Sequence, residues 1–201
     1  MGVRRGLRVL IQLGALWGIA RGLPARAAEA TPALADSQLV ATLHQVNQIE
    51  VQAGQLAQQN GSGPRVRRYG RTLIREHRRA DQQLRQYARS SQMDVAVPPP
   101  AAAMAELNAA RRRLHNLQSL HGSVFDQDFA DVTIQTNKRT IRLVNNGRRQ
   151  TADRRFKAML GQVALQLRQH QQMAGDLVAR SSGKRATGRL RLAGRASHSP
   201  K

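Results

Sequence analysis

One polar residue interrupts the apolar stripe of each long helical segment in the sequence. Apolar residues that recur three or four positions apart mark the buried face of a helix, and these polar residues occupy that face. They are Glu50, His77, Asn137 and His170. A buried carboxyl or imidazole group needs a partner, because loss of contact with water disfavours its charged form.

Two arrangements would satisfy these buried groups. Glu50, His77 and His170 could bind a divalent transition metal ion, since imidazole nitrogens and carboxylates are common ligands of such ions. Alternatively, a glutamate and a histidine could form a hydrogen-bonded pair without metal, which would fix the packing of the helices. The sequence leaves both arrangements open. We expect the neighbouring Glu76 to lie beside the core and to pair with a nearby arginine such as Arg79.

Motifs of familiar catalytic chemistry are missing from the sequence. It contains no cysteine, which excludes disulfides, thiolate metal sites and a cysteine nucleophile. It has no G-x-S-x-G nucleophile motif and no glycine-rich loop that would bind phosphate. Aromatic residues make up 3% of the chain, too few for a surface on which bases stack. We therefore predict no reaction and favour a binding or structural role.

The polar residues are carried by predicted helices, and no window alternates with the period of a strand. The helices are predicted over residues 37–59, 64–91, 101–120, 124–145 and about 151–180. Asp36 suits the N-cap of the first helix, and Pro64 suits the first turn of the second. Asn60-Gly61 and Asn146-Gly147 are typical of helix ends.

The connections between these helices predict their arrangement. Residues 60–63 and 146–150 are short linkers, so the helices on either side of each linker must be antiparallel. The connection over residues 92–122 is long enough to cross the bundle. Two hairpins joined by one long crossover have the connectivity of ferritin-like proteins. We therefore predict an all-α fold over residues 36–180: a ferritin-like up-and-down four-helix bundle with an additional short crossover helix.

Both ends of the chain differ in composition from this bundle. Residues 1–27 combine an arginine-rich start, a short apolar run and small residues before the cleavage point, which is the pattern of a secretory signal peptide. The apolar run is shorter than the about 20 residues that span a bilayer, and we expect no transmembrane span in the mature chain. Residues 28–35 and 181–201 are predicted to be a disordered leader and a basic disordered tail. The expected location is exported, either periplasmic or associated with the outer membrane.

The chain has a large excess of positive charge. Its formal net charge is +21, from 33 Lys and Arg residues against 12 Asp and Glu residues. Arginines crowd residues 65–79 and 111–113. Such basic faces attract polyanions, because binding releases counterions. For an exported protein the expected partners are anionic lipid, lipopolysaccharide or another polyanion, with no specific recognition of nucleic acid.

Four blocks of the sequence resemble the bacterial domain of unknown function 4142 (DUF4142). They are VNQIEVQAGQLAQQ, YGRTLIREHRRADQQL, GSVFDQDFADVTIQTNKRTIRLV and LQLRQHQQMAGDL, in this order within residues 36–179. The resemblance implies a ferritin-like bundle and an exported protein, since members of this family are exported and are often described as outer-membrane proteins. It implies no known reaction, because no reaction is established for the family.

The resemblance also bears on the candidate site. Glu50, Glu76-His77 and His170 match positions of the family. Gln135-Thr136-Asn137 stands where the family usually carries a cluster of acids and a histidine, so a poor ligand replaces a good one there. Di-iron proteins of the ferritin-like type carry a glutamate three residues before each histidine. Apolar residues occupy those positions here, which disfavours iron oxidation and iron storage.

These observations lead to one main expectation and two alternatives. We expect an exported cell-envelope protein with a non-catalytic binding or structural role and no firmly implied cofactor. In the first alternative the protein binds a divalent transition metal through Glu50, His77 and His170. In the second it binds a polyanion or a membrane surface through its arginine-rich face and tail.

Overall fold

Five helices make up the part of the chain that the structure, a computed structural model, describes. That part is residues 32–196, with side chains described over residues 35–179. The helices are α1 (Pro32–Asn60), α2 (Pro64–Ser90), α3 (Ala101–Leu117), α4 (Gly122–Gln150) and α5 (Arg154–Ala196). Within these residues the only β pairing is an isolated bridge between Gly61 and Gly122, so the all-α prediction is confirmed. The predicted signal peptide over residues 1–27 lies outside the described residues.

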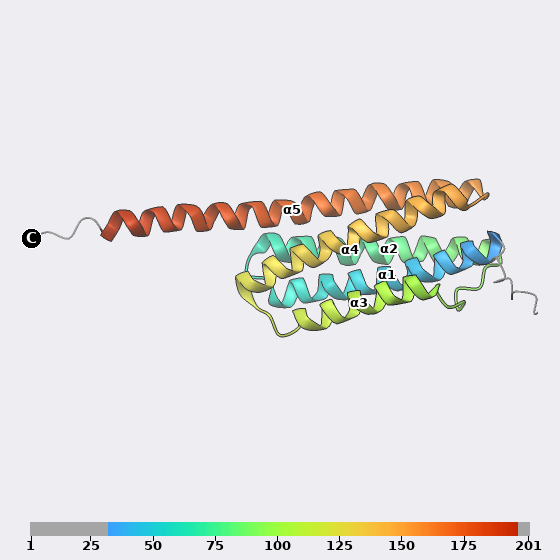
Figure 1. The fold of residues 1–201 in the computed structure, drawn as a ribbon, viewed down its shortest axis with the longest axis horizontal. Coiled ribbons are helices and arrows are strands. Elements are labelled where there is room, and N and C mark those ends of the chain that lie inside the picture. Colours follow the sequence, from blue (N-terminus) through green and yellow to red (C-terminus); the bar gives the residue numbers. More distant parts are fainter. Residues whose placement is uncertain (1–31, 197–201) are drawn as a thin grey trace, which may run out of the picture.

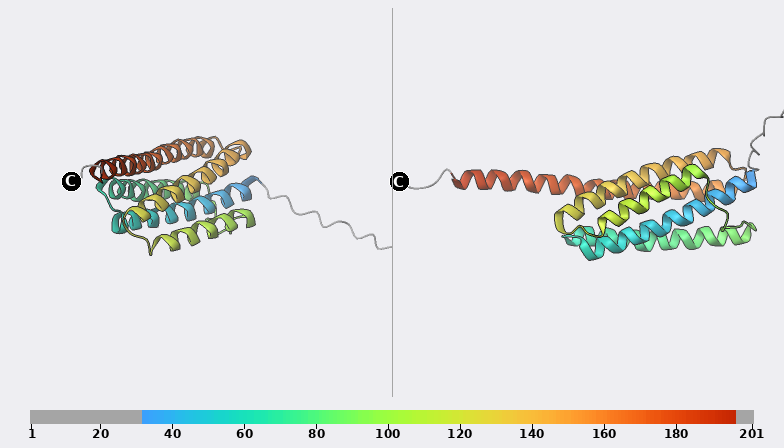
Figure 2. Two further views of the ribbon diagram at one scale, coloured as in Figure 1. Left: turned by 60° about the vertical axis from the view of Figure 1, so that its left-hand side comes forward. Right: turned by 60° about the horizontal axis from the view of Figure 1, so that its bottom comes forward.

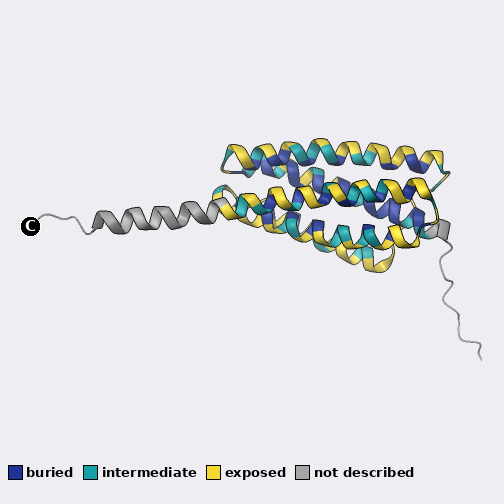
Figure 3. Ribbon diagram, turned by 90° about the horizontal axis from the view of Figure 1, so that it is seen from above, coloured by how far each residue is buried: buried dark blue, intermediate teal, exposed yellow. Residues whose placement is uncertain are grey.

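The helices lie roughly along one long axis and alternate in direction (Figure 1, Figure 2). α1 packs mainly against α2, and α4 packs mainly against α5, so each pair forms an antiparallel hairpin closed by a short connection. α2 and α4 run in the same direction, because α3 carries the chain back along the length of the molecule. α3 lies against α1 and α4. The four long helices thus share one interior, to which each contributes a buried face (Figure 3).

Two clusters of buried apolar side chains fill this interior. One cluster contains Tyr69, Phe125 and Phe129, and the other contains Tyr87 and Phe156. The rings of Phe125 and Phe129 stack with their centroids 5.4 Å apart, and those of Tyr87 and Phe156 stack at 5.0 Å. Burial of one such phenylalanine side chain stabilises the fold by about 1.5–3 kcal/mol. In α2, α4 and α5 a buried polar residue lies between the stretches that supply the two clusters, whereas Glu50 of α1 lies among residues of the first cluster.

The start of α1 and the end of α4 differ from the prediction for a reason of packing. α1 begins at Pro32, so Asp36 lies inside the helix and is not its N-cap; the hydroxyl of Thr151 donates a hydrogen bond to its carboxylate over 2.7 Å. α4 continues through the predicted stop at Asn146-Gly147. Gly147 is buried, and a side chain at this position would collide with Leu39. This glycine therefore allows close packing inside a helix and does not end one.

The end of α5 also differs from the prediction. The helix continues to Ala196, beyond the predicted end near Arg180, and its last turns extend past the other helices (Figure 1). The added stretch contains mostly residues that tolerate a helix, and no proline occurs before Pro200. None of the helices in the described part combines the length and hydrophobicity needed to cross a membrane.

Two glycines set the separation of α1 and α2 next to the buried polar residues. A Cβ atom at Gly70 would lie 2.6 Å from the carbonyl oxygen of Gly54 and 2.8 Å from the Cβ atom of Ala57. A Cβ atom at Gly54 would lie 2.6 Å from the carbonyl oxygen of Gly70. A backbone oxygen cannot rotate away as a side chain can, so any larger residue would push the two helices apart.

We predict that Gly70→Ala lowers the free energy of unfolding by about 1–2 kcal/mol, because the added methyl group overpacks the contact between α1 and α2. The matched control is Gly175→Ala in α5, where a Cβ atom would meet nothing within 4 Å. There alanine should stabilise the protein by about 0.5–1 kcal/mol, through its better helix propensity. Urea unfolding followed by circular dichroism measures both values. Equal effects of the two substitutions would contradict the close helix contact.

Candidate functional site

A layer of buried polar side chains crosses the interior between the two apolar clusters. We call it the polar layer, and it consists of Asn47, Glu50, His77, Asn137 and His170. The four residues that interrupt the apolar stripes are all sealed from solvent. The exposed fraction is 2% for Glu50, 3% for His77, and 0% for both Asn137 and His170. Each of the four long helices contributes to the layer.

His77 is oriented by an asparagine on the neighbouring helix. Its Nδ1 atom lies 2.9 Å from the Oδ1 atom of Asn47 on α1. An amide oxygen only accepts hydrogen bonds, so Nδ1 carries the proton and Nε2 keeps its lone pair. This Nε2 atom is buried and has no hydrogen-bond partner among the described residues. His77 therefore presents an unused imidazole lone pair to the interior.

His170 is held in the same manner by a carboxylate. Its Nε2 atom lies 2.8 Å from Oε2 of Glu76 on α2, while its Nδ1 atom is buried without a partner in the described part of the chain. The hydroxyl of Tyr69 donates a hydrogen bond to the backbone oxygen of His170 over 3.0 Å. Glu76 also pairs with Arg75 at 3.0 Å, so the expected pairing with a nearby arginine is confirmed, with Arg75 in place of Arg79. Arg75 precedes Glu76 directly and lies beside it at the edge of the layer.

Glu50 is the least satisfied ionisable group of the layer. Its Oε2 atom is buried and lacks a hydrogen-bond partner within the described residues. Burial raises the pKa of the Glu50 carboxyl to about 8, so the group is mostly protonated at neutral pH. Burial also raises the pKa of the Tyr69 hydroxyl, helped by the nearby carboxyls of Glu50 and Glu76. Glu50 and Tyr69 are therefore both neutral at neutral pH.

The two histidines are neutral for the same physical reason. Burial, together with the nearby His170, lowers the pKa of His77 to about 3. Burial also lowers the pKa of His170 and outweighs the opposite effect of Glu76. Burial raises the pKa of Glu76, but its hydrogen bonds with His170 and Arg75 outweigh this effect and the net pKa falls. The contact between His170 and Glu76 is thus a hydrogen bond from a neutral imidazole to a carboxylate.

Asn137 completes the layer from α4. Both polar atoms of its side-chain amide are buried and have no hydrogen-bond partner in the described residues. Leaving such a buried polar group unsatisfied costs about 1–3 kcal/mol, so it calls for an explanation such as a bound water or ion. The neighbouring Thr133 and Thr140 are also buried, but their hydroxyls donate to backbone oxygens one turn earlier in α4. Asn137 is therefore the polar side chain of α4 that remains open to a ligand.

The structure brings together some of the predicted site residues and not others. The imidazole rings of His77 and His170 lie with their centroids 5.1 Å apart. The hydrogen-bonded Glu–His pair of the structure uses Glu76, whereas the residue that interrupts the stripe of α1 is Glu50. Across the side chains described, no group of three His, Cys, Asp or Glu residues is arranged to hold a metal ion. The metal site at Glu50, His77 and His170 stays a prediction.

Two residues of the site, Asn47 and Tyr69, were missed in the sequence, although helical spacing indicated both, as it did for Glu76. Asn47 lies four residues after Leu43 and three before Glu50, so it continues the apolar stripe of α1. Tyr69 lies four residues before Leu73, and Glu76 lies three residues after Leu73. Helical spacing alone therefore placed all three on or beside the buried face. It did not show which of them would meet His170.

A small cavity adjoins the polar layer. It has a volume of about 60 Å³, and its lining includes Asn47, His77, Thr140 and Gln166. This volume holds water molecules or an ion but no organic substrate, since drug-sized ligands need about 300 Å³ or more. An open groove between α1 and α2 also has Asn47 and His77 in its lining, which gives solvent a route to the layer.

We predict that the stability of the protein falls as the pH rises from 6.5 to 8, and that Glu50→Gln removes much of this fall. The folded protein holds a proton on Glu50 up to a pKa of about 8, whereas the unfolded chain releases it near 4.5. Folding thus becomes less favourable through this window, by about 1–2 kcal/mol between pH 6.5 and 8. The lowered pKa of His77 acts in the opposite direction, but only below its ordinary value of 6.5.

Urea unfolding at pH 6.5, 7.2 and 8 measures this effect, with Glu106→Gln as the control, because Glu106 is an exposed glutamate of α3. Parallel pH profiles for the unmodified protein and Glu50→Gln would show that Glu50 is ionised in the folded state.

Comparison with known proteins gives one match. The chain matches the family described as a domain of unknown function (DUF4142) over residues 22–177. The matched region contains Glu50, His77, Asn137 and His170, and it extends through α1 to α4 and most of the part of α5 that packs in the bundle. Searches of curated proteins and of solved structures give no match. Since the match covers most of the 201 residues and agrees with the resemblance seen in the sequence, the chain belongs to the DUF4142 family.

Proposed function

We propose that this protein is an exported, non-catalytic binding protein of the cell envelope, folded as a ferritin-like up-and-down four-helix bundle with α3 as its crossover helix. The pairing of α1 with α2 and of α4 with α5 supports this fold, as does the shared direction of α2 and α4. The signal-peptide pattern of residues 1–27 supports export. Export would place the protein in the periplasm or at the outer membrane.

The observation that carries the binding role is the set of buried atoms in the polar layer that lack a partner. Oε2 of Glu50, Nε2 of His77 and Nδ1 of His170 come from three different helices, and none has a hydrogen-bond partner in the described chain. Buried polar atoms are almost always satisfied in folded proteins, by protein groups, water or a ligand. The adjoining cavity of about 60 Å³, which His77 and Asn47 line, is large enough for water or an ion.

The candidate ligand is one divalent transition metal ion, bound by Glu50, His77 and His170. Ligating histidines usually donate their second ring N–H to a carboxylate or an amide oxygen, which fixes the tautomer and leaves the other nitrogen for the metal. His77 with Asn47 and His170 with Glu76 have this arrangement. Both imidazoles are neutral near pH 7, as metal binding requires, whereas Glu50 would release its proton. Because these side chains do not already form a three-ligand group, binding needs a rearrangement within the layer.

We predict that the protein purified from the periplasm, without an affinity tag or chelator, carries about one transition metal ion per chain, and that His77→Leu removes it. Elemental analysis by mass spectrometry measures the metal, and the intact mass shows whether the chain begins at Ala28. The control is His115→Leu, since His115 is an exposed residue of α3. A metal content far below one ion per chain, unchanged after incubation with zinc or cobalt, would rule out the metal ligand. The proposal of export fails separately, if residues 1–27 are retained.

The exposed face of α2 supports a second candidate function, the binding of a polyanion. Four arginines line an open groove on this face: Arg71, Arg75, Arg78 and Arg79. Within the described residues only Arg75 of the four has an ion pair, with Glu76. Unpaired guanidinium groups at this density attract phosphate-rich surfaces such as anionic lipid headgroups or lipopolysaccharide.

We predict that the protein sediments with vesicles of anionic phospholipid at low salt and that the affinity falls steeply as salt is added. The combined substitutions Arg71→Gln, Arg78→Gln and Arg79→Gln should abolish most of this binding. The same number of charges removed at Arg148, Arg149 and Arg142 of α4 provides the control. Equal loss in both triple variants would mean that net charge, rather than the face of α2, attracts the vesicles.

A further inference from the structure

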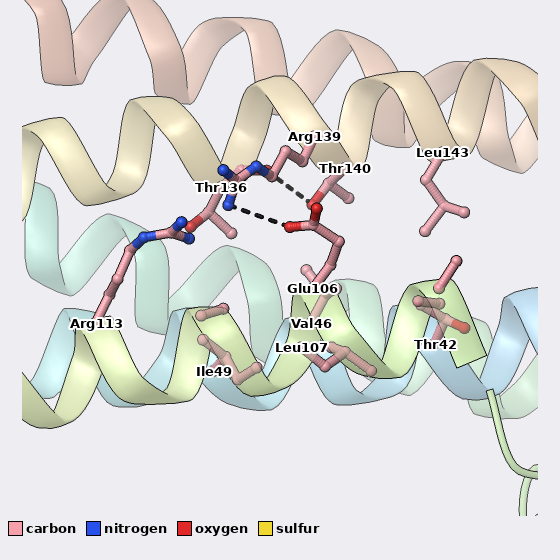
Figure 4. Close-up of a pocket in the computed structure, with 13 residues that line it drawn as sticks. Thr42, Val46, Ile49, Glu106, Leu107, Arg113, Thr136, Arg139, Thr140 and Leu143 are labelled. Carbon is pink, nitrogen blue, oxygen red and sulfur yellow. Dashed lines mark hydrogen bonds and ion pairs between the residues drawn. The ribbon is translucent and has the colours of Figure 1, made fainter. Parts of the chain in front are cut away.

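A second and larger cavity lies on the other side of α1, between α1, α3 and α4 (Figure 4). It has a volume of about 230 Å³, and apolar side chains form most of its wall, among them Val46, Ile49, Leu107 and Leu143. The hydroxyls of Thr42 and Thr140, which also line it, donate to backbone oxygens of their own helices. Cavities with such apolar walls remain dry and take up apolar molecules.

The polar groups of this cavity carry one uncompensated positive charge. Glu106 of α3 pairs with Arg139 of α4 at 3.1 Å, and the pair bridges the two helices (Figure 4). Arg113 extends from α3 toward Thr136 of α4. Its Nη1 atom is buried and has no hydrogen-bond partner among the described residues. An unpaired guanidinium beside an apolar cavity is costly unless an anion joins it.

We propose that this cavity binds a free aliphatic carboxylate, with its chain among the apolar side chains and its carboxylate paired with Arg113. A guanidinium binds a carboxylate through two parallel N–H···O hydrogen bonds, so one ligand would satisfy both the charge and the unpartnered Nη1 atom. The lining extends along α3 from Ala102 to Arg113. This is about 16 Å of helix, which suits one extended chain. The volume is below the about 300–1,000 Å³ of sites for drug-sized ligands, so a lipid with two chains does not fit.

Glu106 and Arg139 both line the cavity and lie on its solvent-exposed side. The side chain of Glu106 is 58% exposed and that of Arg139 is 33% exposed. An ion pair in contact with water contributes little to stability, so it opens readily. The ligand would therefore pass between α3 and α4 without separation of the hairpins. The polar layer is not involved, and the proposal stands or fails independently of the metal ligand.

The test uses decanoate as the probe, below the concentration at which it forms micelles, in isothermal titration calorimetry with the mature protein. We expect saturable binding of one decanoate per chain. Arg113→Met, which keeps an unbranched apolar stem and removes the charged guanidinium, should weaken this binding at least tenfold. Arg112→Met is the matched control, because Arg112 is the neighbouring exposed arginine of α3 outside the lining, and it should leave the affinity unchanged. Decanol, which lacks the charge, should bind the unmodified protein and Arg113→Met equally.

Absence of saturable decanoate binding, or an equal affinity in Arg113→Met, would overturn the proposal. If Arg113→Met does not fold, as judged by circular dichroism, Arg113→Lys replaces it, since lysine keeps the charge but cannot form the two parallel hydrogen bonds. Ala110→Leu fills the cavity from α3 and should abolish the binding of both probes. Uptake of phospholipid from vesicles, in place of decanoate, would contradict the assignment to a free carboxylate.

Discussion

A layer of polar side chains buried halfway along four helices is the constraint on which the rest of this structure depends. Glu50, His77, Asn137 and His170 are all sealed from water. His77, Asn137 and His170 each lie between the stretches of their helices that supply the two apolar clusters, and Glu50 lies among residues of the first cluster. A shift of α2, α4 or α5 by one turn would move its polar residue toward a cluster that contains Phe125 and Phe129, or Tyr87 and Phe156. The cost of burying a polar group without partners therefore fixes the register of the helices.

The layer meets this constraint mainly by staying neutral. Burial keeps Glu50 protonated and both histidines unprotonated near pH 7. A charged group that contacts the layer is Glu76, which hydrogen-bonds to His170 and forms an ion pair with Arg75. Neutral groups avoid the large penalty of buried charge, but they leave lone pairs on Nε2 of His77 and Nδ1 of His170 without donors. The neutrality that lowers the cost of burying the layer thus also leaves the unpartnered atoms on which the proposed metal site rests.

The positions of the layer could be predicted from the sequence, but its pairings could not. Helical spacing places Glu50, His77 and His170 on buried faces, because each continues an apolar stripe. The partner of His170 depends on how α5 lies against α2, which brings it to Glu76 at the edge of the stripe. The helix end predicted at Asn146-Gly147 is wrong for the same reason, because Gly147 packs closely against Leu39 inside α4. Spacing along one helix determines which residues are buried, and only the packing between helices determines what they meet.

The two cavities are separated by one wall, and its composition explains why they differ. Val46 of α1 and Thr140 of α4 line both the small cavity beside His77 and the larger one beside Arg113. The hydroxyl of Thr140 is satisfied by the backbone of its own helix, so the residue can stand between two cavities without a donor to either. What distinguishes the cavities is the chemistry beyond this wall: the imidazole of His77 on one side, and the guanidinium of Arg113 on the other. An imidazole lone pair favours a cation or a hydrogen-bond donor, and a guanidinium favours an anion. The two proposed sites therefore have opposite preferences, because different helices carry a lone pair and a positive charge to the two sides of this wall.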